Sequence, residues 1–427
     1  MTENQRSDAV MNYMLLLTAF CLPWAKPALP LLLALLGICG VWRCWAHKRI
    51  FKPSHTLPLW TSSLTYVLLA LSVLLGFCGP RAHEILEIKF SYIALPLMAF
   101  LLAPIHPARI KRLYMAFILG CLGYDCIAFT HALYCFAQSH DVSVLYYQNL
   151  GWYIHPSYQA MYHGFAIFIL AKHLVEKSFI AWSQTISLVL IVIFSFMIAA
   201  LASKAGIISL SLIGLAFVVY SLARKHSVKL ILMAATLSFI GMVSFNYGIT
   251  GVSSRISEAG KDIGTLTQTG AEEMLNSTAY SSVTLRVVSW SAAFQILLVH
   301  PFGSGVGMAS ARLDEYYLAH GQPYAASIHL NAHQQFLQHG LDLGWIGVIL
   351  LLSTFALLAL RLIKLKNHVG VAFIVLCAIN FMLESMLETQ AGIIFFFFWL
   401  MIFCSERENS STDDPRSVSA SPLDWNR

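Results

Sequence analysis

The sequence predicts an all-α integral membrane protein with about twelve transmembrane helices. Of its 427 residues, 58% are hydrophobic and only 11% are charged, whereas soluble domains carry about 25% charged residues. The hydrophobic residues also form blocks of about 18 to 22, the length of helix that spans a hydrocarbon core. Continuous apolar runs such as 186–201 and 393–403 exclude a transmembrane β-barrel, whose strands alternate apolar and polar residues.

The expected spans divide the chain into four parts. Residues 1–245 hold transmembrane helices 1 to 9, and residues 246–340 form a large, partly helical loop. Residues 341–405 hold helices 10 to 12, and residues 406–427 form a disordered tail. The spans are expected to begin near Met11, Ala28, Leu57, Phe90, Leu113, Tyr158, Ile180, Ala205, Val228, Leu341, Val369 and Thr389.

A polar break at Ser203–Gly206 divides what is otherwise one overlong apolar run. We expect the chain to turn there and to form two antiparallel spans. The first apolar run, near Met11, lacks a small-residue cleavage site and is expected to be a retained helix.

The distribution of basic residues predicts the orientation. With the N-terminus in the cytoplasm, the cytoplasmic segments hold most of the 27 lysines and arginines, although the opposite side has the longest loop. Lysine and arginine gather on the cytoplasmic side of membrane proteins. We therefore expect both termini in the cytoplasm and the large loop outside. These inward-facing segments account for the net charge of +6, so the charge indicates no nucleic-acid partner.

The nine cysteines lie mostly in apolar runs, and none forms a CxxC pair. They are typical of small buried side chains and indicate neither a disulfide framework nor a zinc site.

The second half of the large loop is predicted to be ordered and to carry the function. Thr284–His300 has the pattern of an amphipathic helix, 301–307 is a turn cluster, and Ala309–Ala319 fits a short helix. Asn331 is suited to cap a helix that leads into the tenth span. The first half, 246–282, is polar and rich in Ser, Thr and Gly, and we expect it to be a flexible cover.

Lys204 and Arg286 are the first two candidates for chemistry. Lys204 lies between two apolar runs, where a lysine is costly and therefore a functional candidate. Snorkelling to the headgroups is the alternative interpretation. Arg286 and Trp290 lie one helical turn apart, and a guanidinium fork suits phosphate oxygens. A merely solvated arginine is the alternative.

The turn cluster after His300 contains Gly303 and Gly305. Glycines let backbone N–H groups approach an anion closely, although most glycine clusters are plain turns.

His333 is the candidate base. It is expected near the membrane boundary at the start of a helix, between Asn331 and Gln334. An imidazole there can take a proton from a hydroxyl near neutral pH. His329 and His333 have the spacing of metal ligands, but the glutamate of HExxH and a clear third ligand are missing. We therefore expect no metal site, and a capping histidine is the alternative.

Glu384 and Glu388 are four residues apart, which places both carboxylates on one face if the segment is helical. They could hold a basic residue, bind a cation or lie in water, and a salt bridge is the interpretation we favour. Asp125 in the fifth span is a further carboxylate, to which the sequence assigns no role.

The order of these motifs resembles the O-antigen ligase and O-antigen polymerase superfamily. The motifs are Ser-Lys-Ala-Gly at 203–206, Leu-Arg-Val-Val-Ser-Trp at 285–290, His-Pro-Phe-Gly-Ser-Gly-Val-Gly at 300–307 and Asn-Ala-His-Gln-Gln-Phe-Leu-Gln at 331–338. The resemblance is strongest over 191–350. Residues 154–158 and 384–388 are similar to motifs in some members. Lys204 stands where an arginine is usual, and Gln334 stands where asparagine usually follows the histidine.

The resemblance implies a glycosyl transfer at the periplasmic face of the bacterial inner membrane. The donor would be a glycan on undecaprenyl diphosphate, and the acceptor a sugar hydroxyl on lipid A–core or on another lipid-linked glycan. Transfer would be inverting and independent of a metal or cofactor. His333 would be the base, and Arg286 and Lys204 would contact the diphosphate, with Arg255 and Arg312 as further candidates.

Alternatives of three kinds stay open at this point. A polymerase or a protein O-oligosaccharyltransferase would use the same donor and differ in acceptor, and the motif order favours the ligase. A secondary transporter is also compatible with twelve spans, but transporters usually carry paired repeats and polar midplane helices. A non-enzymatic flippase or assembly partner is the third.

Overall fold

The computed structural model describes residues 2–102, 104–176, 179–211, 214 and 282–407, and their regular structure is entirely helical. The all-α class is therefore confirmed for this part of the chain. The predicted ninth span, the first half of the loop with Arg255, and the tail after residue 407 lie outside the described residues. The count of twelve spans stays a prediction.

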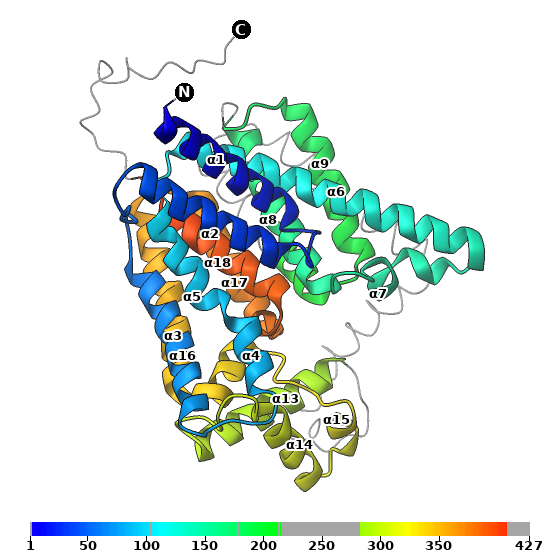
Figure 1. Ribbon diagram of the computed structural model, residues 1–427. Coiled ribbons are helices and arrows are strands. Elements are labelled where there is room, and N and C mark those ends of the chain that lie inside the picture. Colours follow the sequence, from blue (N-terminus) through cyan, green and yellow to red (C-terminus); the bar gives the residue numbers. More distant parts are fainter. Residues whose placement is uncertain (1, 103, 177–178, 212–213, 215–281, 408–427) are drawn as a thin grey trace.

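The N-terminal half builds an apolar bundle (Figure 1). Its main helices are α1 (Glu3–Cys21), α2 (Leu29–Ala46), α3 (Leu57–Leu74), α4 (Ala82–Lys89), α5 (Ser91–Met98), α6 (Pro107–Ser139), α8 (Pro156–Val175) and α9 (Gln184–Ala200). The predicted fourth span, expected to begin near Phe90, corresponds to α5, and α4 precedes it as a separate short helix. The predicted fifth span begins at Pro107 rather than near Leu113, because His106 caps α6 and proline suits the first helical position.

The C-terminal part adds a small helical group and three helices of the bundle. The small group consists of α13 (Ser282–Val299), α14 (Ala309–Ala319) and α15 (Pro323–Ser327), and the bundle helices are α16 (Gln335–Lys364), α17 (His368–Leu383) and α18 (Gln390–Cys404). The predicted helices at 284–300 and 309–319 are confirmed. Residues 391–404 of α18 are all buried, as expected for a helix that is apolar on every face.

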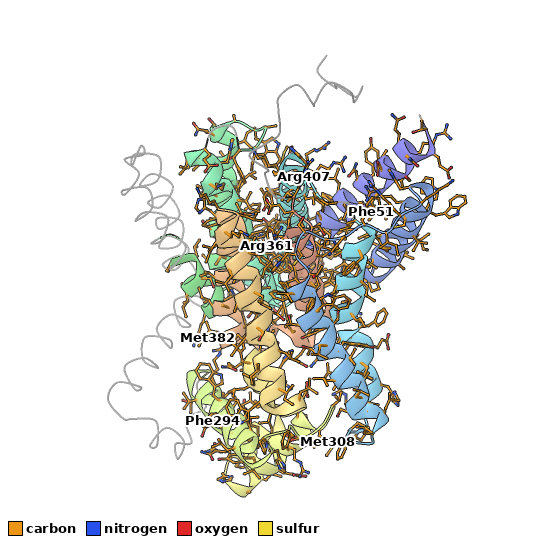
Figure 2. The ribbon with its side chains drawn as sticks, turned by 90° about the vertical axis from the view of Figure 1, so that its left-hand side faces the viewer. Phe51, Phe294, Met308, Arg361, Met382 and Arg407 are labelled. Atoms are coloured by element: carbon orange, nitrogen blue, oxygen red, sulfur yellow. The ribbon has the colours of Figure 1, made fainter. Side chains whose placement is uncertain are left out.

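Among the described residues, four helices are long and apolar enough to cross a membrane, namely α2, α3, α6 and α16. Shorter apolar helices are α9, α17 and α18, together with most of α13. Figure 2 places Arg361 and Arg407 toward one end of the molecule and Phe294 and Met308 toward the other. The group α13–α15 therefore covers the end opposite these arginines. Which end faces the cytoplasm stays a prediction.

Helix α16 is broken at Gly344, where φ is 69° and ψ is −158°. The carbonyl of Pro301 accepts a hydrogen bond from the Trp345 N–H at 3.0 Å, and the Ser304 N–H donates to the Leu341 carbonyl at 2.8 Å. The turn after α13 is thus docked into the break. An ideal Cβ on Gly344 would lie only 2.1 Å from the Pro301 oxygen. The break separates residues 335–343 from the apolar part of α16.

Gly344→Ala is expected to destabilise the protein by more than about 3 kcal/mol, because the residue combines a strained conformation with a backbone clash. The matched control is Gly76→Ala. Gly76 also has a positive φ, of 81°, but an added Cβ meets nothing within 4 Å. Thermal unfolding of both variants in detergent measures the difference, and equal melting temperatures would show that the docked turn does not constrain α16.

Candidate active site

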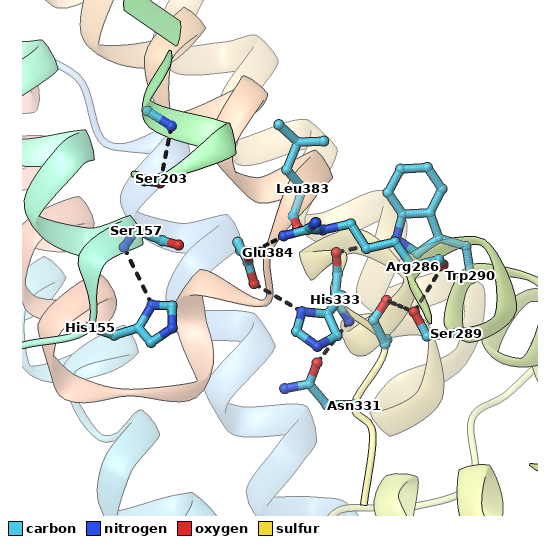
Figure 3. Close-up of polar contacts among 12 residues, drawn as sticks. His155, Ser157, Ser203, Arg286, Ser289, Trp290, Asn331, His333, Leu383 and Glu384 are labelled. Carbon is cyan, nitrogen blue, oxygen red and sulfur yellow. Dashed lines mark hydrogen bonds and ion pairs between the residues drawn. The ribbon is translucent and has the colours of Figure 1, made fainter. Parts of the chain in front are cut away.

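The carboxylate of Glu384 joins two of the predicted site residues (Figure 3). One oxygen, Oε1, accepts a hydrogen bond from Arg286 Nη2 at 2.6 Å. The other, Oε2, lies 2.9 Å from His333 Nδ1. Glu384 ends α17 in an extended conformation, with φ −149° and ψ 150°, so its side chain leaves the helix and reaches both partners. Segments about 50 and 100 residues apart in sequence thereby meet at one group.

Arg286 is fixed in place by the end of α17. Besides the ion pair, its Nε donates to the carbonyl of Leu383 at 3.2 Å. The side chains of Arg286 and Glu384 are 17% and 15% exposed, so water screens their attraction less than at an open surface. The predicted salt bridge of Glu384 is therefore present in the structure.

His333 lies in a strained turn, with φ 44°, and three polar contacts hold this turn. The His333 N–H donates to Asn331 Oδ1 at 2.8 Å. Its carbonyl accepts from Trp290 Nε1 at 3.2 Å. Ser289 Oγ donates to the carbonyl of Ala332 at 3.3 Å. Positive φ at a residue other than glycine is uncommon and often marks a functional site.

The predicted role of Asn331 as a helix cap is wrong. Helix α16 begins at Gln335, and Gln334 caps it, because the Gln334 side chain accepts from the Leu337 N–H at 2.6 Å. Gln334 is extended, with φ −158°, which brings its long side chain back over the first turn. His333 therefore precedes the helix rather than forming its start.

The contact with Glu384 fixes the tautomer of His333. Burial alone would raise the pKa of Glu384. The hydrogen bond from His333 and the charge of Arg286 lower this pKa by more than burial raises it, so it lies below its ordinary value. The carboxylate is ionised at neutral pH and can only accept hydrogen bonds. His333 Nδ1 must then donate, and the neutral ring carries its lone pair on Nε2.

The polar break at Ser203–Gly206 is confirmed. Helix α9 ends at Ala200, and helical structure resumes over 204–211. Ser203 Oγ accepts from the Gly206 N–H at 3.2 Å, and the side chain of Lys204 is half-buried.

Two contacts place the Lys204 segment beside the helices that end at the site. Asn380, one helical turn before Glu384, donates to Ser209 Oγ at 3.0 Å. An ideal Cβ on Gly206 would lie 2.4 Å from the Ala160 Cβ on α8, so the two backbones pack closely.

His155 is a neighbour that the sequence analysis did not single out as a site residue. It caps α8, and its Nδ1 accepts from the Ser157 N–H at 3.3 Å. Figure 3 shows its ring on the other side of Glu384 from Arg286. It interacts electrostatically with Glu384, His333 and Arg286. The only sequence signal was the likeness of residues 154–158 to a family motif.

A second buried charge cluster lies beside the first. Lys89 Nζ is 2.8 Å from Asp342 Oδ2 and 3.1 Å from Glu388 Oε1, and Lys89 and Asp342 are only 1% and 3% exposed. Gln335 Nε2 donates to Glu388 Oε1 at 3.0 Å, and the Gln335 side-chain oxygen accepts from the Leu387 N–H. Charged residues next to or within apolar runs were the signal that could have identified Lys89 and Asp342.

The predicted shared helix face of Glu384 and Glu388 is wrong. Helix α17 ends before Glu384, and Glu388 lies in the short 3₁₀ turn 386–388. The two carboxylates therefore serve different clusters: Glu384 binds Arg286 and His333, whereas Glu388 binds Lys89.

His300, Gly303 and Gly305 are not brought to this site. His300 follows the far end of α13, about 21 Å along the helix axis from Arg286. The glycines serve backbone packing: an ideal Cβ on Gly303 would lie 2.6 Å from the Gly344 nitrogen, and one on Gly305 2.5 Å from the Phe77 carbonyl oxygen. The turn therefore lies apart from Arg286, and a contact of its backbone N–H groups with an anion stays a prediction.

Arg312 and His329 also have partners elsewhere. Arg312 Nη1 lies 3.0 Å from Glu315 Oε2 on the surface of α14. His329 Nδ1 lies 2.6 Å from Asp314 Oδ2. Since residues 329–334 are not helical, His329 and His333 do not share the helix face that their spacing suggested.

Asp125 pairs with His163 inside the bundle, at 2.8 Å between Oδ1 and Nε2. The pair joins α6 to α8, which gives the unassigned carboxylate of the fifth span a partner.

The comparison with protein families finds one match, to the family described as O-antigen ligase, over residues 189–352. The matched range contains Lys204, Arg286 and His333. A search of the curated proteins gave no match. The family match confirms the resemblance inferred from the motifs, and it supports a membrane enzyme of the O-antigen ligase or polymerase type.

Lys89→Gln is expected to destabilise the protein by about 3–5 kcal/mol, since it leaves Asp342 and Glu388 buried without a cation. Arg81→Gln is the control, because Arg81 also pairs with a carboxylate, Glu84, but its side chain is 74% exposed. We expect Arg81→Gln to leave the melting temperature in detergent almost unchanged. Equal effects of the two substitutions would contradict a supporting role for the Lys89 cluster.

Proposed function

We propose that this chain, whose residues 189–352 match the O-antigen ligase family, is a ligase of that type. It transfers a glycan from undecaprenyl diphosphate to a sugar hydroxyl of lipid A–core, at the periplasmic face of the bacterial inner membrane. The lipid diphosphate is already a leaving group, so the reaction needs a base for the acceptor and positive charge for the departing diphosphate.

The observation that carries this proposal is the bridge from Arg286 through Glu384 to His333. It places His333 Nδ1 and Arg286 Nη2 on the two oxygens of one carboxylate, at 2.9 Å and 2.6 Å. The other ring nitrogen of His333, Nε2, then carries the lone pair. A carboxylate that orients a histidine through Nδ1 is also the arrangement that makes Nε2 a general base in hydrolases. The surroundings therefore favour proton abstraction at His333 Nε2.

In the proposed step, His333 Nε2 takes the proton of the acceptor hydroxyl. The hydroxyl oxygen attacks the anomeric carbon from the face opposite the diphosphate and forms the new glycosidic bond. The bond from the anomeric carbon to the diphosphate oxygen breaks, and the lipid diphosphate leaves with the electron pair. The anomeric configuration is inverted, and the step uses no metal or cofactor.

Arg286 and Lys204 are the proposed contacts of the diphosphate. Arg286 adds its charge next to the base and is held in position by Glu384 and Leu383. Lys204 supplies a point charge from the first residue of the helical segment 204–211, which packs beside α17 and α8. Arg312 pairs with Glu315 and is no longer favoured for this role, and Arg255 lies outside the described residues.

His333→Ala is expected to lower glycan transfer by purified protein at least about 100-fold, since removing a general base costs 10²- to 10⁴-fold in rate. Transfer is measured with a defined lipid-linked donor and lipid A–core acceptor, and membrane insertion is checked by yield and size-exclusion profile.

His329→Ala is the matched control for this experiment. It removes a nearby histidine whose side chain is 74% exposed and paired with Asp314, and it should leave transfer unchanged. Normal transfer by the His333 variant at normal abundance would refute the mechanism.

The acceptor separates a ligase from a polymerase, which would use the same donor and the same base. Deletion of the gene is expected to leave bare lipid A–core and to cause long lipid-linked chains to accumulate. A polymerase deletion would instead leave core that carries single repeats. Electrophoresis of the lipopolysaccharide distinguishes the two outcomes. Core that carries single repeats would show that the protein is a polymerase and not a ligase.

A further inference from the structure

A cavity between α1, α2 and α6 collects three arginines far from the candidate active site. Arg43, Arg109 and Arg112 line it, together with apolar side chains that include Leu15, Leu16 and Leu113. Arg109, Arg112 and Leu113 share one face of α6.

The cavity carries an excess of positive charge. Arg43 is 5% exposed and pairs with Asp8 at 2.5 Å. Arg109 and Arg112 form no ion pair with any described residue. The Asp8 carboxylate also attracts Arg109, while Arg43 and Arg112 repel it. Arg43 is buried and Arg109 half-buried, whereas Arg112 is exposed, so water screens the repulsion between Arg43 and Arg109 less than it would at an open surface. An anion in the cavity would relieve this repulsion, and guanidinium forks match phosphate oxygens in geometry.

The polar and the apolar side chains that line the cavity lie at different ends of its wall. On α6 the two arginines come first and Leu113 follows, and on α1 Asn12 precedes Leu15 and Leu16 along the cavity wall. Charge therefore lies toward one end of the wall, and apolar side chains continue from it toward the middle of the helices. A phosphate headgroup with an acyl chain fits this order.

Two observations place the cavity at a lipid interface. Ile105 lines it and exchanges backbone hydrogen bonds with Ser405 and Arg407, and Figure 2 shows Arg407 at the end opposite Phe294 and Met308. The outer faces of α1 and α2 expose large apolar side chains, among them Tyr13 at 71% and Trp45 at 71%. Such faces contact lipid in a membrane.

We propose that this cavity binds an anionic glycerophospholipid, with its phosphate on Arg109, Arg112 and Arg43 and its acyl chain along Leu15, Leu16 and Leu113. Basic pockets between transmembrane helices bind anionic headgroups in this way. The site is separate from the Glu384 cluster, and its occupancy stabilises the packing of α1 and α2 against α6.

The test uses the delipidated full-length chain in detergent, with dioleoyl phosphatidylglycerol as probe. Native mass spectrometry measures its affinity, and thermal unfolding measures the stabilisation. Dioleoyl phosphatidylcholine has the same chains without net charge, and glycerol 1-phosphate has the charge without the chains. We expect only phosphatidylglycerol to bind and to raise the melting temperature.

The variant Arg109→Gln/Arg112→Gln is expected to weaken phosphatidylglycerol binding roughly tenfold or more. Arg109→Lys/Arg112→Lys keeps the charge and should retain most of the binding, which separates charge from packing. Lys364→Gln/Lys366→Gln removes two exposed charges at the end of α16 and should have no effect. Equal binding of both lipids, full binding by the Gln variant, or equal stabilisation by glycerol phosphate alone would each overturn the proposal.

Discussion

The candidate site depends on one carboxylate that is bound on both oxygens. Glu384 receives Arg286 from α13 on one side and His333 from the turn before α16 on the other. A turn with positive φ at His333 has no regular hydrogen-bond ladder to hold it, so its position comes from such side-chain contacts. Trp290 and Ser289 add two bonds from α13 to the same turn. Without Glu384, Arg286 would lose its charge partner and His333 would lose the group that sets its tautomer.

The Lys89 cluster holds the chain segment that follows Glu384. Gln335, the first residue of α16, binds both Glu388 and the backbone of Leu387. The segment from Glu384 to Glu388 is therefore held at each end by a different set of buried charges. Because Gly344 separates residues 335–343 from the apolar part of α16, this first part of the helix can serve the polar layer while the remainder packs in the bundle.

The local features of the structure were predictable from the sequence. The helix at 309–319, the helix after 282 and the break before Lys204 follow from composition and periodicity within short windows, and such signals suffice for the type of an element. Residue type and position made His333 and Arg286 candidates, and the likeness to a known family assigned them their roles. The predictions failed where a contact depends on distant residues. Lys89 and Asp342 are 253 positions apart in the sequence. The residues around Glu384 carry no signal that α17 ends before it. The choice of Gln334 over Asn331 as the cap depends likewise on how the turn is held by Trp290.

A double-mutant cycle on Glu384 and His333 tests the central claim most directly. The catalytic rate of purified protein is measured for Glu384→Gln, His333→Ala and the combination, with abundance and melting temperature as controls. If Glu384 acts by orienting His333, Glu384→Gln slows transfer about 100-fold, and the double variant is no slower than His333→Ala alone. Losses that multiply in the double variant would show that the two residues act independently, and would contradict the account of the site given above.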